Sequence, residues 1–419
     1  MNPVFIFFYD IAIRIYGALI WFASWRNEKA KRWIEGRKNL LQLIQNSIQS
    51  GDKIIWMHCA SVGEFEQGRP VIEKLKQKFP EKKILLTFFS PSGYELRKNY
   101  SGADYVFYLP LDTRRNAKQF ISIVNPELAI FVKYEFWFHF LNSLNKKNIP
   151  AILVSGIFRP QQFFFSWYGK SFLKVLRTFK KIFVQDVDSL QLLSSNGFLN
   201  AELSGDTRFD RVIDVKNNFT AIPPLERFCS NSKVIVAGST WAADEDLLID
   251  FINHHPENNC KWIFVPHEVN EAGISSLEKK LLGNAVRFSK SSESDSEKKF
   301  LIVDQVGMLS RIYHYADVAY VGGGFGKGIH NILEAAVYGV PVIFGPNHSK
   351  FREAVEITEK KFCFSIQNEN QLADIVSQLF SNEKFYSACS SGCEKYVSEK
   401  SGATEQVVNY ITNKIFSSQ

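Results

Sequence analysis

Two glutamates follow short apolar runs that have the composition of buried strands. Glu64 lies in ASVGE (60–64), after the run 53–58, and Glu135 lies in KYEFW (133–137), after the run 128–132. Ligands of open parallel sheets bind beyond the carboxyl ends of the strands, where a carboxylate can accept a proton from an attacking hydroxyl. A helix-capping carboxylate or a surface charge is the alternative for each residue. The residues alone leave both interpretations open.

Arg208 is a candidate for binding an anion. It lies in GDTRFDR (205–211), where Gly-Asp signals a turn after the short run 201–203. The guanidinium fork makes bidentate contacts with carboxylate or phosphate groups. A structural ion pair is the alternative.

A glycine-rich segment gives the strongest local signal. GGGFGKG (322–328) follows the apolar run 317–321 and precedes IHNILEAA (329–336). Glycines allow close backbone approach to a ligand, and a helix that follows offers N–H groups to a phosphate. The spacing fits neither G-x-G-x-x-G nor a Walker loop, which disfavours a dinucleotide dehydrogenase or P-loop ATPase. Glu334, in the expected helix, can accept both hydroxyls of a ribose, and a glycine turn without a ligand is the alternative.

Two further strand ends agree with a site in the second half. GSTW (238–241) is a second candidate for phosphate or sugar contact, and His267 follows the run 261–265. Of the eight histidines, His267 and His348 are the best functional candidates, and we interpret the other six as structural or solvated. The sequence contains no HExxH motif, no paired CxxC spacing and no G-x-S-x-G elbow, so neither a metal site nor a hydrolase is supported.

The elements that must position these residues alternate between apolar runs and amphipathic stretches. This alternation predicts α/β structure with parallel sheets covered on both faces. An Asn- and Pro-containing stretch at 215–231 predicts a linker, and the economical architecture is two doubly wound domains with a cleft between them. We place the first domain at 29–218 and the second at 219–419. The strands are expected at 53–58, 83–88, 105–108, 128–132, 151–154 and 181–184, then at 233–237, 261–265, 300–303, 317–321 and 340–344.

The first residues pose a membrane question. The chain has 419 residues, 45% of them hydrophobic, and a net charge of +7, which excludes a disordered or polytopic membrane protein. Residues 4–25 are apolar except for Asp10 and Arg14, which are spaced to pair on one helix face, and a basic flank follows. We therefore predict a membrane anchor or interfacial helix at 1–28, with its flank in the cytoplasm. An amphipathic helix packed on a soluble domain is the alternative.

These segments together resemble the 3-deoxy-D-manno-octulosonic acid (Kdo) transferases of lipopolysaccharide synthesis. The likeness rests on the apolar N-terminal segment, ASVGE (60–64), EFW (135–137), 205–210, GSTW (238–241) and NILE (331–334). It implies a GT-B fold of two Rossmann-like domains facing across a cleft. It also implies transfer of Kdo from CMP-Kdo to a lipid A precursor (lipid IVA), with inversion, and without metal or cofactor.

The resemblance also implies roles for single residues. Glu64 corresponds to the general base, and Glu135 and Arg208 to residues that steady the transition state. The expected CMP-binding residues are Pro266, His267, Gly307, Met308, Leu309, Asn331, Ile332, Leu333 and Glu334.

The implied partners are CMP-Kdo, lipid IVA and anionic lipid of the inner membrane, at its cytoplasmic face, and not nucleic acid. The positive charge is then explained by an anionic lipid and an anionic sugar nucleotide. A nucleotide-sugar epimerase of the same fold and a non-catalytic nucleotide-binding scaffold are the alternatives.

Overall fold

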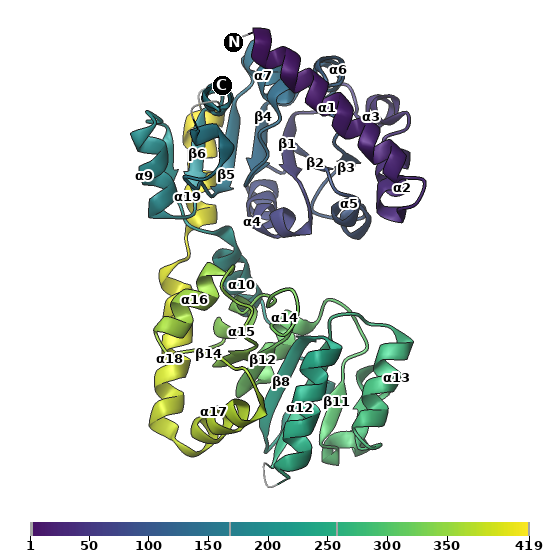
Figure 1. The fold of residues 1–419 in the computed structure, drawn as a ribbon, viewed down its shortest axis with the longest axis vertical. Helices are drawn as coiled ribbons and strands as arrows, with labels where there is room; N and C mark the ends of the chain where they lie inside the picture. Colours follow the sequence, from purple (N-terminus) through teal and green to yellow (C-terminus); the bar gives the residue numbers. More distant parts are fainter. Residues whose placement is uncertain (1–2, 167–168, 257–258, 418–419) are drawn as a thin grey trace. The chain divides into compact units, whose positions relative to one another are not determined.

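The chain folds into two compact units. The computed structural model describes residues 3–166, 169–256 and 259–417. The first unit comprises Met1–Asp210 and Ser401–Gln419, and the second comprises Arg211–Lys400 (Figure 1). The division therefore differs from the expected one, both at the boundary and in the C-terminal residues, which return to the first unit.

The first unit contains a parallel seven-stranded sheet in its described residues, in the order β3-β2-β1-β4-β5-β6-β7. The strands of its centre are buried along their whole length, as expected for a sheet covered on both faces. The strands are β1 (Ile54–Cys59), β2 (Lys83–Phe88), β3 (Tyr105–Tyr108), β4 (Leu128–Val132), β5 (Ala151–Gly156), β6 (Lys181–Val184) and β7 (Ala201–Leu203).

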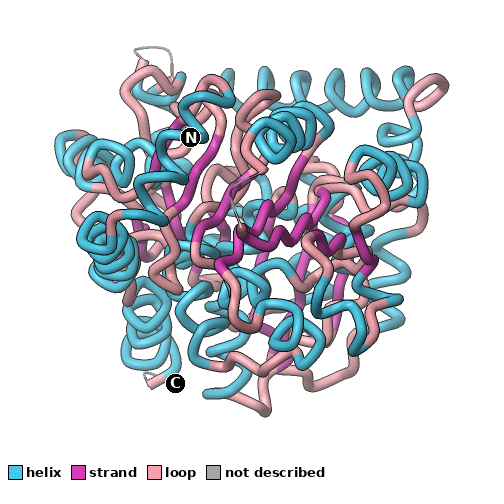
Figure 2. Tube along the Cα trace, turned by 90° about the horizontal axis from the view of Figure 1, so that it is seen from below, coloured by secondary structure: helices cyan, strands magenta, loops and turns pink. Residues whose placement is uncertain are grey.

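Helices cover both faces of this sheet, and two separate apolar clusters form its core. Figure 2 shows helices outside the strands. The helices are α1 (Pro3–Ala23), α2 (Glu28–Glu35), α3 (Leu40–Ser47), α4 (Val62–Lys78), α5 (Pro91–Arg97), α6 (Arg114–Val124), α7 (Phe138–Lys146), α8 (Lys170–Leu176), α9 (Val187–Ser195) and α19 (Ala403–Ile411). Helix α10 (Thr207–Asn217) begins in the first unit and continues into the second.

The last helix, α19, completes the core of the first unit. Val407, Val408 and Ile411 are fully buried in one cluster with β1, β4 and α4. Asp210 accepts hydrogen bonds from the backbone N–H groups of Gly402 (2.5 Å) and Thr404 (2.6 Å) at the start of this helix. The C-terminal residues belong to the first unit because their apolar side chains are buried in its core.

The second unit repeats the architecture. Its described residues form a parallel seven-stranded sheet in the order β10-β11-β9-β8-β12-β13-β14. The expected strands are present, and two short edge strands, β10 and β14, were not expected. The strands are β8 (Lys233–Thr240), β9 (Cys260–Pro266), β10 (Ala285–Arg287), β11 (Phe300–Ile302), β12 (Val318–Val321), β13 (Val342–Phe344) and β14 (Phe364–Ser365).

Several helices of the second unit, among them α12, α13 and α17, contribute to an apolar cluster that includes Trp262 and Tyr320. A short helix occupies part of the stretch that we expected to be an irregular linker. The helices are α11 (Pro223–Cys229), α12 (Ala242–His254), α13 (Glu271–Lys280), α14 (Leu309–Ile312), α15 (Leu333–Ala336), α16 (Arg352–Glu359), α17 (Glu369–Ser381) and α18 (Glu383–Glu399).

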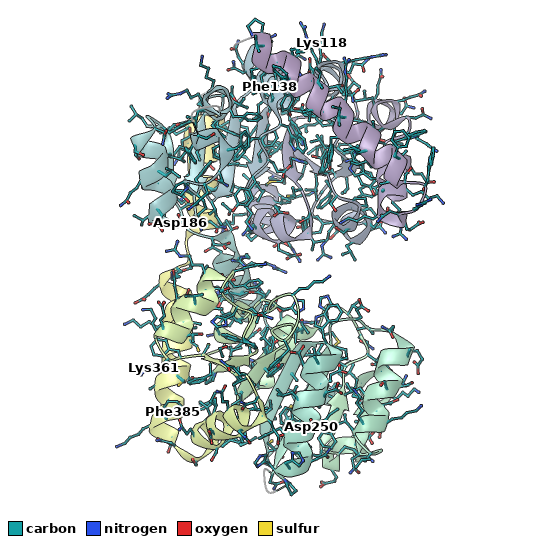
Figure 3. The ribbon with its side chains drawn as sticks, in the orientation of Figure 1. Lys118, Phe138, Asp186, Asp250, Lys361 and Phe385 are labelled. Atoms are coloured by element: carbon teal, nitrogen blue, oxygen red, sulfur yellow. The ribbon has the colours of Figure 1, made fainter. Side chains whose placement is uncertain are left out.

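Helix α1 lies against the first unit along one face (Figure 1). The ring of Phe5 contacts that of Phe138, which Figure 3 labels, with centroids 5.6 Å apart. The hydroxyl of Tyr9 donates to Asp112 at 2.5 Å. Asp10 pairs with His139 at 2.5 Å, and not with Arg14 as its spacing suggested, because packing turns it toward α7. The opposite face of α1 remains apolar and exposed, and the helix is long and apolar enough to cross a membrane by length and composition.

Candidate active site

Glu64 and Glu135 follow neighbouring strands at the point where the strand order reverses. β1 pairs with β2 on one side and with β4 on the other, so the segments after β1 and β4 flank this switch point. Helix α4 begins at Val62, which puts Glu64 in its first turn, as the sequence predicted. The half-buried Glu64 accepts a hydrogen bond from the hydroxyl of Ser61.

Glu135 is held by two donors. Its Oε2 accepts hydrogen bonds from Trp137 Nε1 at 2.6 Å and from His58 Nε2 at 3.0 Å. The His58 ring is fully buried, and its Nδ1 lies 2.9 Å from Thr87 Oγ1. Thr87 in turn accepts from Trp56 Nε1 at 2.8 Å. This series of hydrogen bonds, which begins inside the sheet, therefore fixes the position of Oε2 of Glu135.

The buried thiol of Cys59, at the end of β1, is affected by the charges of both glutamates. Burial raises the pKa of the Cys59 thiol well above its ordinary value, and the charges of Glu64 and Glu135 raise it further. Both carboxylates therefore act on the same point at the end of β1. The two glutamates differ in their surroundings. Glu64 lies in the first turn of a helix, and Glu135 is fixed by two hydrogen bonds.

Arg208 is paired within its own segment. Its Nε and Nη2 each lie 2.8 Å from Asp206 Oδ2, in line with the structural alternative. Thr207, which begins α10, donates to the carbonyl of Gln67 at 2.5 Å and so places this helix against α4, one turn beyond Glu64. The guanidinium therefore belongs to the same unit as both glutamates, on an element that touches α4.

Strained backbone marks three strand ends. Lys133, after β4, has φ 65°, Ser155 in β5 has φ 55°, and Ser239 in β8 has φ 54°. Left-handed conformations of residues other than glycine are costly and gather at binding and catalytic sites. These three residues lie at the edge where ligands of parallel sheets bind, whereas others with positive φ, such as Leu282 and Lys361, lie in loops that precede strands.

A stack of three rings forms at the switch point of the second unit. The ring of His267 lies 4.6 Å from that of Trp241 and 4.2 Å from that of His330, both nearly parallel. Trp241 Nε1 donates to His330 Nε2 at 3.1 Å. Burial lowers the pKa of His330 to about 4. His330 was interpreted as structural or solvated, and only its position beside the glycines could have signalled this contact.

The glycine-rich segment serves close packing of the chain. A Cβ on Gly322 would collide with the backbone of Ser239, and one on Gly324 would lie 2.6 Å from the backbone of Gly345. Asp244, in the first turn of α12, accepts from the N–H of Gly323 at 2.9 Å. This carboxylate and Glu245 beside it disfavour a phosphate at the start of α12, which was a candidate contact.

The expected CMP-binding residues lie around these strand ends. His267 follows β9, and its N–H donates to the carbonyl of Thr240 at 2.9 Å. Gly307 has φ 83°, and the side chain of Leu309, two residues later, lies next to Gly238 at the end of β8. Asn331 Nδ2 donates to Glu334 Oε1 at 3.1 Å. The structure therefore gathers these segments at one edge of the sheet.

Two expected details of this region differ in the structure. Helix α15 has only four residues and begins at Leu333. Glu334 therefore lies in its first turn, and not one turn into the helix as expected. His348, the other favoured histidine, contacts the carbonyl of its neighbour Pro346 at 3.0 Å. Among the described residues, no group of three or more His, Cys, Asp or Glu side chains lies close enough together to hold a metal.

Solved structures show which class of fold this is. The chain superposes on UDP-GlcNAc 2-epimerase from Neisseria meningitidis with a TM-score of 0.61 at 14% identity, covering 86% of this chain and 100% of that one. A glycosyltransferase from Rickettsia africae gives a TM-score of 0.56 at 13% identity, covering 88% and 100%. With two parallel sheets of Rossmann type, the protein has the fold of the GT-B glycosyltransferases and related epimerases.

Comparisons of sequence show which members of this fold class the chain is similar to in its motifs and over its length. Residues 31–211 match the family described as 3-deoxy-D-manno-octulosonic-acid transferase (kdotransferase). The transferase of that name from Aquifex aeolicus is 28% identical over 81% of this chain and 90% of its own length, and that from Chlamydia trachomatis serovar A is 27% identical over 86% of each. The chain is thus similar over most of its length to the Kdo transferases, which confirms the resemblance seen in its motifs and supports a glycosyltransferase.

Proposed function

We propose that this protein transfers Kdo from CMP-Kdo to a lipid A precursor, lipid IVA, with inversion at the anomeric carbon. The observation that carries the proposal is the position of Glu64, half-buried in the first turn of α4 at the switch point of a chain similar to Kdo transferases. Its carboxylate accepts the proton of the acceptor hydroxyl as the hydroxyl oxygen bonds to the anomeric carbon. The bond from that carbon to the phosphate oxygen breaks, and CMP leaves with the electron pair.

The remaining residues bind and orient the donor in this proposal. Glu135, fixed by His58 and Trp137, presents a carboxylate in a set orientation, which suits the cationic character of a transition state at a sugar carbon. Arg208 supplies positive charge for the donor's carboxylate or phosphate while Asp206 holds it. The ring of His267, stacked on Trp241, offers an aromatic surface to the cytosine. The residues 307–309 and 331–334 hold the remainder of CMP.

The test of the base is Glu64→Gln, which keeps the shape and removes the proton acceptor. We expect Kdo transfer to lipid IVA, measured by mass spectrometry of the lipid product, to fall about 10²- to 10⁴-fold. Glu73→Gln, on the same helix and paired with Arg69, is the matched control and retains activity. Full activity of Glu64→Gln would contradict the assignment, and conversion of a nucleotide sugar without acceptor would favour an epimerase.

The reaction is proposed to need no metal, because CMP leaves with one phosphate and not with a pyrophosphate. We therefore expect an excess of EDTA to leave the initial rate of transfer unchanged. The measurement is CMP release with and without chelator. A rate that falls with EDTA and recovers with Mg²⁺ would refute metal independence while leaving the assigned base intact.

A further inference from the structure

A cavity of about 600 Å³ lies within the first unit, between α1, the α2–α3 segment and the chain that leads into α6. This volume falls in the range of about 300–1,000 Å³ that is typical of ligand sites. Its walls include apolar side chains of Trp21, Leu40 and Leu111 and the two cations Arg14 and Arg37. None of these residues belongs to the candidate catalytic or CMP-binding sets.

Arg37 is a half-buried cation with no carboxylate partner among the described residues. Its Nε, Nη1 and Nη2 donate to the backbone carbonyls of Leu109, Trp33 and Phe89 at 2.9, 3.0 and 2.8 Å. Its guanidinium carbon lies 3.8 Å from the centroid of the Trp33 ring. Burial lowers the pKa of Arg37 to about 9. Among the described residues no carboxylate forms an ion pair with it, so its charge is compensated only by carbonyl dipoles and aromatic rings.

Two further donors lie at the same cavity. The indole N–H of Trp33 is buried and has no hydrogen-bond partner in the described part of the chain, although the residue is only 7% exposed. Arg14 is exposed on α1 and has no ion-pair partner among the described residues. Uncompensated donors next to apolar walls suit a ligand with both an anionic group and a hydrocarbon part.

The cavity adjoins the residues that hold Glu135. The Phe89 carbonyl accepts from Arg37, and the Phe89 ring lies 4.7 Å from the ring of Trp137. Trp137 donates to Glu135. Three contacts therefore connect Arg37 to the carboxylate that is proposed to steady the transition state. Proximity to Glu135 serves no purpose for a bulk membrane lipid, whereas the acceptor of the reaction must lie near this carboxylate.

We propose that this cavity binds a phosphate group and the adjoining acyl segment of the phosphorylated lipid acceptor. This inference rests on the proposed function and specifies where its acceptor is held. The phosphate is placed against Arg37 and Arg14, and the acyl segment against the apolar wall that includes Leu111. Binding in this orientation presents the sugar part of the acceptor toward the end of β4.

The first test fills the cavity. Gln42 lines it and is exposed on α3, and Gln45 is exposed on the same helix outside it. We expect Gln42→Trp to raise the KM for lipid IVA at least tenfold with little change in the KM for CMP-Kdo, and Gln45→Trp to leave both unchanged. Equal KM values for lipid IVA in the two variants would overturn the proposal.

The second test removes charge. Arg14→Gln is expected to raise the KM for lipid IVA several-fold, and Lys118→Gln, an exposed cation on α6 that Figure 3 labels, is the matched control. The effect of Arg14→Gln should shrink for an acceptor that lacks phosphate. An effect that persists undiminished without the phosphate would overturn the placement of that group.

Direct binding separates this inference from the proposed function. Lipid IVA in detergent micelles is titrated into the unaltered protein and the Gln42→Trp variant, and phosphatidylglycerol vesicles are titrated in parallel. We expect the variant to lose affinity for lipid IVA and to keep its vesicle binding. If the unaltered protein transferred no Kdo, the proposed function would fail, and this titration would still decide the cavity. Loss of vesicle binding with lipid IVA binding retained would reassign the cavity to bulk anionic lipid and overturn the inference.

Discussion

At the scale of single residues, the orientation of Glu135 depends on groups far away in the sequence. His58 lies within β1, and Trp137 packs against Phe89, which follows β2. A carboxylate that is fixed before the substrate arrives pays no reorganisation at the moment of reaction. This is the physical reason to expect that its hydrogen-bond donors affect the rate without touching the substrate.

Trp137→Phe tests this positioning, because it removes the N–H that donates to Glu135 at 2.6 Å and keeps an aromatic ring on Phe89. A hydrogen bond to a charged group contributes about 1.5–3 kcal/mol. We expect kcat to fall roughly ten- to a hundredfold with the KM for CMP-Kdo changed less than about twofold. A rise in that KM with kcat unchanged would show that Trp137 supports binding of the donor and not the orientation of Glu135.

His330 makes the stability of the second unit depend on pH. The pKa of His330 is lowered from its ordinary value of 6.5 to about 4, mainly by burial and to a lesser extent by the charge of His267. The unfolded chain therefore binds more protons than the folded one between these values, so stability falls as the pH decreases from about 6.5 to about 4. We expect His330→Gln to flatten this slope in urea unfolding monitored by tryptophan fluorescence. An unchanged slope would assign it to another group.

The positions of Glu64 and Glu135 after two strands could be predicted from the sequence, because the end of a strand can be recognised from the apolar run before it. His58 and His330 could not be assigned in the same way. Their contacts join residues 77 and 89 positions apart, from His58 to Glu135 and from Trp241 to His330. Local pattern carries no information about such pairs until the order of the strands is known.

At the scale of elements, α1 presents two different faces. Its inner face is tied to the first unit through Tyr9 and Asp10. Its outer face carries apolar side chains that are mostly more than half exposed, among them Phe7, Phe8, Leu19 and Phe22. We predict from this geometry that α1 lies in the membrane interface, next to exposed basic residues of α2.

The triple substitution Phe8→Ser, Leu19→Ser, Phe22→Ser tests this face. The side chains are 63, 62 and 58% exposed, so we expect the thermal unfolding midpoint to stay within a few degrees. Sedimentation with phosphatidylglycerol-containing vesicles should show at least a tenfold loss of affinity, because each apolar side chain contributes about 1.5–3 kcal/mol when fully buried. Leu199→Ser, at a residue 96% exposed outside α1, serves as the control. Undiminished vesicle binding would contradict an interfacial role.

The long, buried strands were the elements that could be predicted best. β2 and β4 have the expected bounds because apolar residues of this density bury both faces of a parallel strand. The edge strands β10 and β14 have three and two residues, too few to show a period. The pairing of Asp10 was missed because the spacing to Arg14 is satisfied on any helix, while the contact to His139 depends on packing.

At the scale of the whole molecule, the second unit is inserted between the parts of the first. The linear pattern of strands and helices placed residues 401–419 with the neighbouring sequence, since nothing local distinguishes α19 from a helix of the second unit. Only burial of its apolar side chains beside α4 assigns it. The class of fold was therefore predictable, and the path of the chain through it was not.

Ile411→Ala tests the contribution of α19 to the first unit. The side chain is fully buried, and truncation of such a residue costs about 2–5 kcal/mol. We expect a corresponding loss of stability in urea unfolding of the first unit, and no change for the exposed Asn409→Ala on the same helix. An unfolding curve identical to that of the unaltered protein would show that α19 is dispensable for the core.

The return of α19 also sets the order in which the protein can be completed during translation. Helix α1 is synthesised before the second unit, whereas the sheet beside it lacks Val407, Val408 and Ile411 until α19 has followed the second unit off the ribosome. The second unit, which is contiguous, can fold before the first is finished. The unit that holds Glu64 is thus begun before the second unit and closed after it, so the apolar face of α1 is exposed well before the proposed catalytic unit is complete.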